Sequence, residues 1–210
     1  MDREKQTTKQ RILAEALTLF SEKGYEPVTV AEIANAVGIK PPSLYKHYLS
    51  KKDIFDAVLK EMYFRYERYV TSLRRSGSDP AKDAEYFMGM GEDKLIDVTL
   101  SMFSFYLHDE FTRKVRKMLT IEQYSNPELA RVYVRQYFDD ILSFQNALFS
   151  EYVKAGFLLP GDTEIMALQY FSPLLMYIKV CDNQPEREPE AVDMITKHIR
   201  QFNKLYKNVD

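Results

Sequence analysis

The chain has 210 residues, of which 45% are hydrophobic and 29% are charged. This composition is too apolar for a disordered chain, and the length allows a substantial buried core. A single cysteine, Cys181, excludes an intrachain disulfide and a cysteine metal cluster. The most apolar stretch, residues 171–180, is shorter than the roughly 20 residues of a membrane span, and the polar first ten residues lack the apolar core of a secretory signal. We therefore expect a cytoplasmic protein without a membrane partner.

The first three helices are predicted by their local signals. Apolar residues recur at helical spacing in almost every long segment and glycine is scarce, which indicates an all-α protein. A first helix buries one stripe and can end at Gly24; the stripe consists of Ile12, Leu13, Ala16, Leu17 and Phe20. Thr29 and Glu32 form a capping box that starts a second helix, which Gly38 ends. Proline at position 41 suits the first turn of a third helix, running to about residue 47.

The remaining helices follow from capping signals and breaks. A second capping box at 50–53 starts a fourth helix to about residue 75, and a loop at 76–80 follows it. Glycines at 89 and 91 make the segment 80–91 the weakest part of the pattern. Helical patterns then cover residues 92–107, 109–124, 127–154, 162–181 and 189–207.

The charge is unevenly distributed. Residues 1–52 carry nine Lys and Arg and six Asp and Glu, whereas the rest of the chain carries 20 and 25. The run from Lys40 to Lys52 holds four lysines and one histidine but no carboxylate. A solvated charged face is the default interpretation of a short lysine run taken alone. Here the run also fits a phosphate-facing surface on an otherwise acidic protein.

Two short helices joined by a glycine turn, after an amphipathic helix, match a helix-turn-helix, and the second of the pair is then the recognition helix. Leu44 and Tyr48 share one face and should be buried against the first two helices. That arrangement leaves the other side chains for the DNA major groove: Pro42, Ser43, Lys46 and His47, with Tyr45 near its edge. For each of these residues, plain packing or solvent exposure is the alternative.

These residues resemble the TetR family of bacterial regulators. The matching positions are Arg11-Ile12-Leu13, Ala16, Leu19-Phe20, Gly24-Tyr25, Thr29-Val30, Ile33-Ala34, Gly38-Ile39, Leu44-Tyr45, His47-Tyr48 and Ser50-Lys51. The resemblance covers about a quarter of the chain. It implies an all-α homodimer with a three-helix helix-turn-helix head at residues 1–50. A larger helical bundle at residues 51–210 would then bind an inducer and dimerise.

The resemblance also implies roles for individual residues. Positions matching Thr29, Tyr45 and Lys51 commonly touch the DNA backbone in this family, and those matching Ser43, Lys46 and His47 commonly face bases. This chain departs from the family at Lys40, where serine often caps the recognition helix, and at Pro42, where a small residue is common. The start of the recognition helix therefore depends on its paired prolines.

A ligand site and a dimer interface are predicted in the bundle. Aromatic residues are dense beyond residue 52, as in a small-molecule site, although most of them should be core residues. Since central helices enclose the ligand in the family, the candidates are Phe103, Tyr106, Tyr133 and Tyr137, and the inducer would be apolar or aromatic. Two C-terminal helices carry apolar seams that fit a four-helix dimer interface or, alternatively, a monomeric core. The interface candidates are Ile165, Leu168, Phe171, Leu175, Val192, Ile195, Ile199, Phe202 and Tyr206.

No catalytic constellation is present: the sequence has no phosphate loop, nucleophile elbow or zinc-binding helix motif. His108-Asp109-Glu110 is the nearest approach to a ligand cluster, but adjacent helical residues point in different directions. The sequence therefore predicts a ligand-responsive repressor, without a metal or cofactor, that binds a palindromic operator on double-stranded DNA as a homodimer. The alternatives are a TetR-like activator, a DNA-binding protein with a non-transcriptional role, and a small-molecule-binding enzyme.

Overall fold

A computed structural model describes residues 7–72 and 79–208 of the chain. Its described part is helical apart from turns and one isolated bridge between Leu158 and Lys207. The chain divides into two compact units, one formed by residues up to Tyr66 together with Glu110–Val134, the other by Glu67–Asp109 and the residues from Arg135 on. A long helix and a distant pair of helices complete the first unit, and the functional boundary expected at residue 50 stays a prediction.

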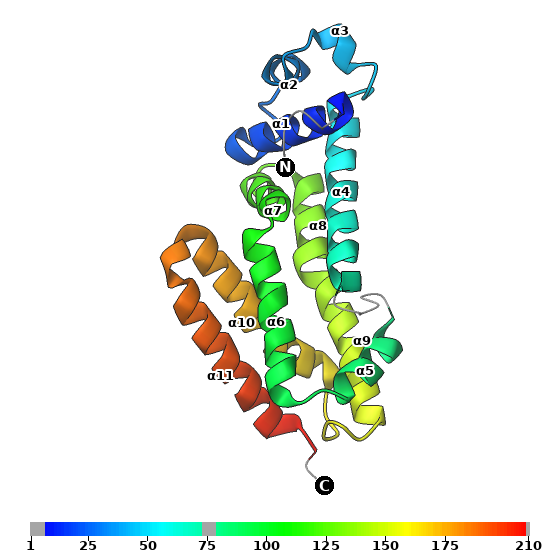
Figure 1. The fold of residues 1–210 in the computed structure, drawn as a ribbon, viewed down its shortest axis with the longest axis vertical. Helices are drawn as coiled ribbons and strands as arrows, with labels where there is room; N and C mark the ends of the chain where they lie inside the picture. The colour runs from blue at the N-terminus through cyan, green and yellow to red at the C-terminus, as the bar shows by residue number, and fades with distance from the viewer. Residues whose placement is uncertain (1–6, 73–78, 209–210) are drawn as a thin grey trace. The chain divides into compact units, whose positions relative to one another are not determined.

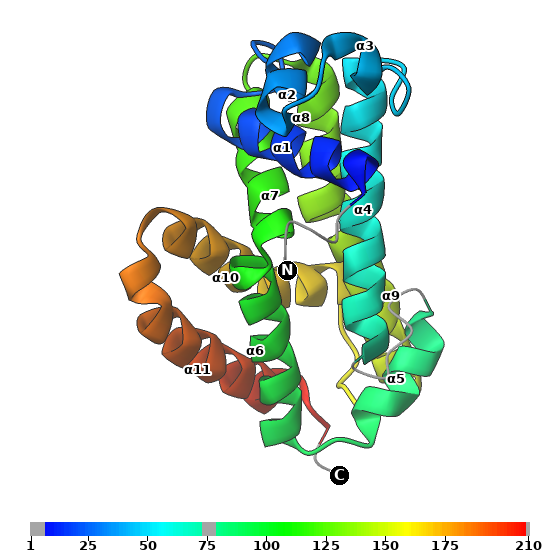
Figure 2. The same ribbon diagram turned by 45° about the horizontal axis from the view of Figure 1, so that its top comes forward.

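The first unit holds α1 (Thr8–Lys23), α2 (Val30–Val37), α3 (Pro41–Leu44), α7 (Glu110–Glu122) and α8 (Pro127–Val134), together with most of α4 (Lys51–Ser72). α1 packs against both α2 and α7, and Figures 1 and 2 show α1 lying across α7. The core of this unit excludes solvent completely at Phe20, Ile33, Leu44 and Val115. Apolar side chains on α7 thus complete a core that the short helices α2 and α3 could not form alone.

The second unit holds α5 (Pro80–Met88), α6 (Glu92–His108), α9 (Asp140–Lys154), α10 (Thr163–Asn183) and α11 (Glu188–Tyr206), with a short 3₁₀ turn, η3 (Pro185–Arg187), between the last two. α10 packs on α9, α11 and α6, and Figure 1 shows α10 and α11 side by side. Aromatic rings form the centre of its core: Phe202 stacks on Phe149 with ring centroids 5.4 Å apart and meets Tyr170 edge-on at 5.0 Å. Such ring pairs stabilise beyond the area that they bury.

Most predicted helices are confirmed to within a few residues. The predicted start of α8 at residue 127 and end of α9 at residue 154 are both observed, but a π-helical turn, η2 (Arg135–Asp139), joins the two α-helices. Within the weak segment 80–91, residues 80–88 form the regular helix α5, capped by Asp79 and opened by Pro80. The predicted loop at 76–80 and the predicted end of the fourth helix lie largely outside the described residues. No helix in the described ranges is long and apolar enough to span a bilayer.

Candidate nucleic-acid interface

The predicted capping box at the start of α2 is present. The Thr29 hydroxyl accepts a hydrogen bond from the Glu32 N–H at 3.2 Å, and the Glu32 carboxylate accepts one from the Thr29 N–H at 2.8 Å. The ammonium of Lys23 lies 2.9 Å from the same carboxylate. The hydrogen bond from Lys23, together with those from Thr29, lowers the pKa of Glu32 to about 2. The helix therefore starts at a fixed residue, with its first N–H groups satisfied.

Gly38 makes the turn between α2 and α3. Its backbone is left-handed, with φ 78° and ψ 32°, and its N–H donates to the carbonyls of Ala34 and Asn35. The N–H of Ile39 donates back to Ala34 at 2.9 Å, which closes the end of α2. A residue with a Cβ is disfavoured in this conformation, so glycine permits the sharp change of direction into α3.

The recognition helix is shorter than the predicted 41–47. The α-helix ends at Leu44, and residues 45–47 continue as a turn in which Lys46 and His47 donate to carbonyls three residues back. Two successive prolines remove two N–H donors at the start of the segment, and Lys40 provides no side-chain cap. Beyond Leu44, Lys46 and His47 make these tight three-residue hydrogen bonds, while the N–H of Tyr48 donates to the Leu44 carbonyl four residues back.

Burial divides the residues of this segment as the spacing predicts. Leu44 is completely buried and Tyr48 is 4% exposed, which confirms that both face the core. Pro42, Tyr45 and Lys46 are exposed, and Ser43 and His47 are half-buried. These five side chains therefore lie on one short, solvent-facing segment, while Thr29 and Lys40 are exposed at the starts of α2 and α3. Hydroxyl, ammonium and imidazole groups on such a surface can bind phosphates and base edges.

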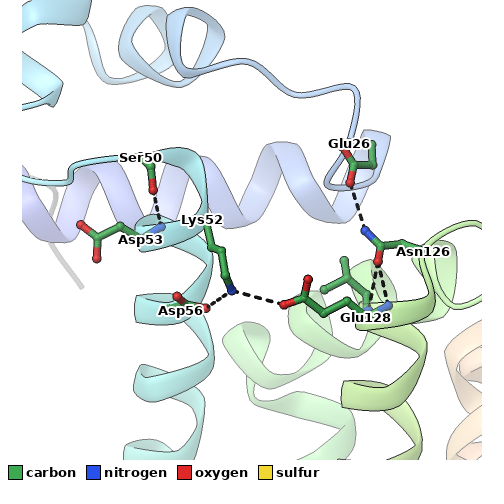
Figure 3. A network of polar contacts seen from close by, with 8 residues as sticks. Glu26, Ser50, Lys52, Asp53, Asp56, Asn126 and Glu128 are labelled. Carbon is green, nitrogen blue, oxygen red and sulfur yellow. Dashed lines mark hydrogen bonds and ion pairs between the residues drawn. The ribbon is translucent and has the colours of Figure 1, made fainter.

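The two lysines at the start of α4 make internal contacts. The Lys51 ammonium donates to the main-chain carbonyls of Tyr25 and Glu26, both at 3.0 Å, and lies 4.3 Å from the centre of the Tyr25 ring. Lys52 pairs with Asp56 at 3.2 Å and with Glu128 at 3.4 Å, as Figure 3 shows. The acid-free basic run of the sequence is thus partly neutralised by acidic groups outside it.

Sequence reasoning did not find Glu122, the last residue of α7. Its side chain is 3% exposed, and its Oε1 accepts hydrogen bonds from the N–H groups of Tyr25 at 2.6 Å and Glu26 at 3.4 Å. Asn126 adds a contact to the Glu26 side chain at 3.0 Å, drawn in Figure 3. Because Glu122 lies 97 residues from Tyr25 in the chain, no local pattern could have predicted this contact.

The predicted ligand residues lie in different parts of the structure. Phe103 and Tyr137 are buried and Tyr106 is half-buried, all three in the second unit. Tyr133 is half-buried and belongs to the first unit. A shared ligand site for these four residues stays a prediction.

The predicted interface residues divide into two sets by exposure. Ile165 and Leu168 are 48% and 47% exposed, while Leu175, Val192 and Tyr206 are half-buried. The other four, Phe171, Ile195, Ile199 and Phe202, are buried in the core of the second unit. The seam on α11 thus faces inward, because α6 and α10 cover it. Only the exposed and half-buried residues can lose substantial exposed area to a second copy of the chain.

The helix-turn-helix region matches a known family. A sequence model of the family described as "Bacterial regulatory proteins, tetR family" matches residues 12–58. The negative transcriptional regulator IcaR of the icaADBC biofilm operon is 41% identical over 78 residues in Staphylococcus aureus strain Newman, a match covering 37% of this chain. The IcaR protein of Staphylococcus epidermidis is 49% identical over 71 residues. The chain spans only about two fifths of the length of these relatives, 41% and 37% respectively.

Solved structures match over nearly the whole chain. A TetR-family transcriptional regulator of Mesorhizobium loti superposes with a TM-score of 0.67 at 20% identity, covering 96% of this chain and 97% of its own. SmeT, the repressor of a multidrug efflux pump of Stenotrophomonas maltophilia, gives 0.66 at 20% identity, covering 97% and 92%. SmeT in complex with triclosan gives 0.65 at 19% identity, covering 97% and 93%. At these identities the superpositions show a shared fold.

Proposed function

We propose that this chain is a transcriptional repressor of the TetR family of bacterial regulatory proteins, which binds a palindromic operator as a homodimer and responds to a small-molecule ligand. The family consists of regulators of transcription and not of enzymes. The observation that carries the proposal is the exposed segment at α3, which presents Tyr45 and Lys46 on a capped and tightly packed helix-turn-helix.

The proposed DNA contacts follow from this surface. Ser43, Lys46 and His47 would face base edges, with Pro42 beside them. Thr29, Lys40 and Tyr45 would contact phosphates and thereby set the register of the head on the duplex. Two heads related by a two-fold axis would read half-sites roughly 34–36 Å apart or a multiple of that distance.

Repression and ligand response are supported by relatives. IcaR is described as a negative transcriptional regulator, and SmeT as a repressor that forms a complex with triclosan. By analogy, this chain would bind an apolar or aromatic compound in the second unit, near Phe103, Tyr106 and Tyr137. A ligand that favours a head separation different from the half-site spacing would release the operator. Residues for self-association are Ile165 and Leu168, with Leu175, Val192 and Tyr206 beside them.

DNA selection followed by fluorescence anisotropy tests the proposal. Random-sequence duplexes are enriched on the full chain, and the selected duplex is compared with a scrambled one at several salt concentrations. We expect salt-sensitive binding that prefers the selected sequence, which should contain an inverted repeat. The double variant Tyr45→Ala/Lys46→Ala should lose about 30-fold or more in affinity, since each good contact contributes about 1–3 kcal/mol. A matched control, Lys60→Ala at an exposed position of α4, should bind normally. Equal affinity for selected and scrambled duplexes would refute the proposal.

A further inference from the structure

Two charged side chains of opposite sign contact the turn that joins α1 to α2, residues 24–26. On one side, the Glu122 carboxylate at the end of α7 accepts from the N–H groups of Tyr25 and Glu26. Separately, the Lys51 ammonium at the start of α4 donates to the carbonyls of the same two residues. The polar main-chain groups of both residues are thus satisfied by side chains from two other helices, and we call this arrangement the turn clamp.

The Glu122 carboxylate is buried, so it relies on the turn for hydrogen bonds. The side chain is 3% exposed, and its second oxygen, Oε2, is buried without a hydrogen-bond partner among the described residues. A buried carboxylate loses its hydration, and hydrogen bonds from main-chain N–H groups offset part of that loss. The 2.6 Å bond from Tyr25 is in the range of a charge-assisted hydrogen bond. These hydrogen bonds form only when the turn is in its observed position, so the buried carboxylate favours that position.

The backbone at Gly24 leaves room for this carboxylate. Gly24 has φ 88° and ψ 168°, and a Cβ built on it would lie 2.5 Å from Glu122 Oε1. Any side chain at this position would therefore displace the carboxylate or the turn. Glycine at position 24 serves the contact to α7 as well as the end of α1.

The turn clamp lies at the entrance to the helix-turn-helix. α2 begins at Val30, a few residues after the turn, and α3 follows α2 through the tight Gly38 turn. Further polar contacts around the clamp join α8: Asn126 binds the Glu26 side chain and caps α8 through the N–H groups of Glu128 and Leu129 (Figure 3). Fixing residues 25 and 26 against α4, α7 and α8 therefore fixes the path into α2 and α3.

We infer that Glu122 and Lys51 are positioning residues, which hold the helix-turn-helix to α7 and α4, and that Lys51 performs this role in place of a phosphate contact. The inference rests on the proposed DNA binding. A lysine ammonium has three N–H donors, and Lys51 directs two of them to main-chain carbonyls. Its half-buried stem lies beside the Tyr25 ring, and the ring attracts the cation as well.

Salt dependence separates a positioning lysine from a phosphate contact. The variant Lys51→Met retains the apolar stem and loses the charge. We expect its affinity for the selected duplex to fall at least about fivefold with the slope of log K against log salt unchanged. Loss of a phosphate contact would instead reduce the slope by about 0.9 per head, or about 1.8 for a dimer. Lys60→Ala is the matched control and should change neither quantity. A reduced slope for Lys51→Met would overturn the inference for Lys51.

Amide hydrogen exchange tests the clamp without DNA, so it remains informative if the chain binds no operator. In the full chain, Glu122→Ala should accelerate exchange of the Tyr25 and Glu26 amides at least about tenfold, while amides within α10 keep their wild-type rates. Glu122→Gln retains a carbonyl acceptor and should restore part of the protection, which also covers the case in which the alanine variant does not fold. Wild-type exchange at both amides in the glutamine and alanine variants would overturn the inference for Glu122.

Discussion

Replacing Gly24 by alanine should strain the backbone at that position and displace the Glu122 carboxylate. The backbone conformation, φ 88° and ψ 168°, lies in a region populated essentially by glycine, and holding alanine there costs about 2 kcal/mol. The added Cβ would also lie 2.5 Å from Glu122 Oε1, so the carboxylate must withdraw from the Tyr25 N–H. Loss of a hydrogen bond to a charged group costs about 2 kcal/mol. We therefore expect Gly24→Ala to lower the free energy of unfolding by about 4 kcal/mol.

Gly38→Ala is the matched control. Gly38 also has a positive φ, 78°, but nothing lies within 4 Å of the Cβ that would be added. Only the left-handed backbone opposes this substitution, at a cost of about 1–2 kcal/mol. Because the chain has no tryptophan, urea unfolding is best followed by far-ultraviolet circular dichroism. The two variants should therefore differ by about 2–3 kcal/mol.

A double-mutant cycle isolates the contact with Glu122. In the Glu122→Ala background the carboxylate is absent, so Gly24→Ala should cost only the backbone strain of about 2 kcal/mol. Equal costs of Gly24→Ala in the two backgrounds, or equal costs of the two glycine substitutions, would refute this reasoning.

The remaining predictions concern capping, pH and the C-terminal helices. Thr29→Ala should lower stability by about 1 kcal/mol in urea unfolding, because it removes the N-cap of α2. Since the pKa of Glu32 falls in the folded state from 4.5 to about 2, its contribution is present above pH 4.5 and is lost as the pH falls toward 2. Glu32→Gln should therefore make unfolding less sensitive to acid in that range, as acid titrations can show. Ile195→Ala should cost about 3 kcal/mol by making a core cavity, whereas Leu168→Ala should chiefly weaken self-association in sedimentation equilibrium.

The head was predictable because its signals are local. The capping box joins residues three apart, and the left-handed position of Gly38 depends on its own backbone. The burial of Leu44 and Tyr48 follows from helical spacing. Each feature is determined within a few residues, so the sequence predicts the order and approximate bounds of α1 to α3.

Contacts between distant segments were not predictable in the same way. The pattern of Ile195 and Ile199 identifies a buried face of α11 but not what covers it, and α6 and α10 of the same chain do so. The sequence pattern from residue 127 to 154 predicts one continuous α-helix, whereas the structure has the π-helical turn η2 between α8 and α9. Sequence spacing also placed Lys51 in a basic run, whereas its partners are carbonyls about 25 residues away.

The internal use of Lys51 and Lys52 bears on how the proposed repressor would search a genome. Non-specific affinity for duplex DNA comes almost entirely from cations that neutralise phosphates. Two of the four lysines in the run 40–52 are engaged by carbonyls or carboxylates of the chain, which leaves Lys40 and Lys46 as its exposed cations without an observed ion pair in the described ranges. A run with fewer available cations should hold random DNA less tightly, so the share of the residence time at an operator that comes from base contacts should increase.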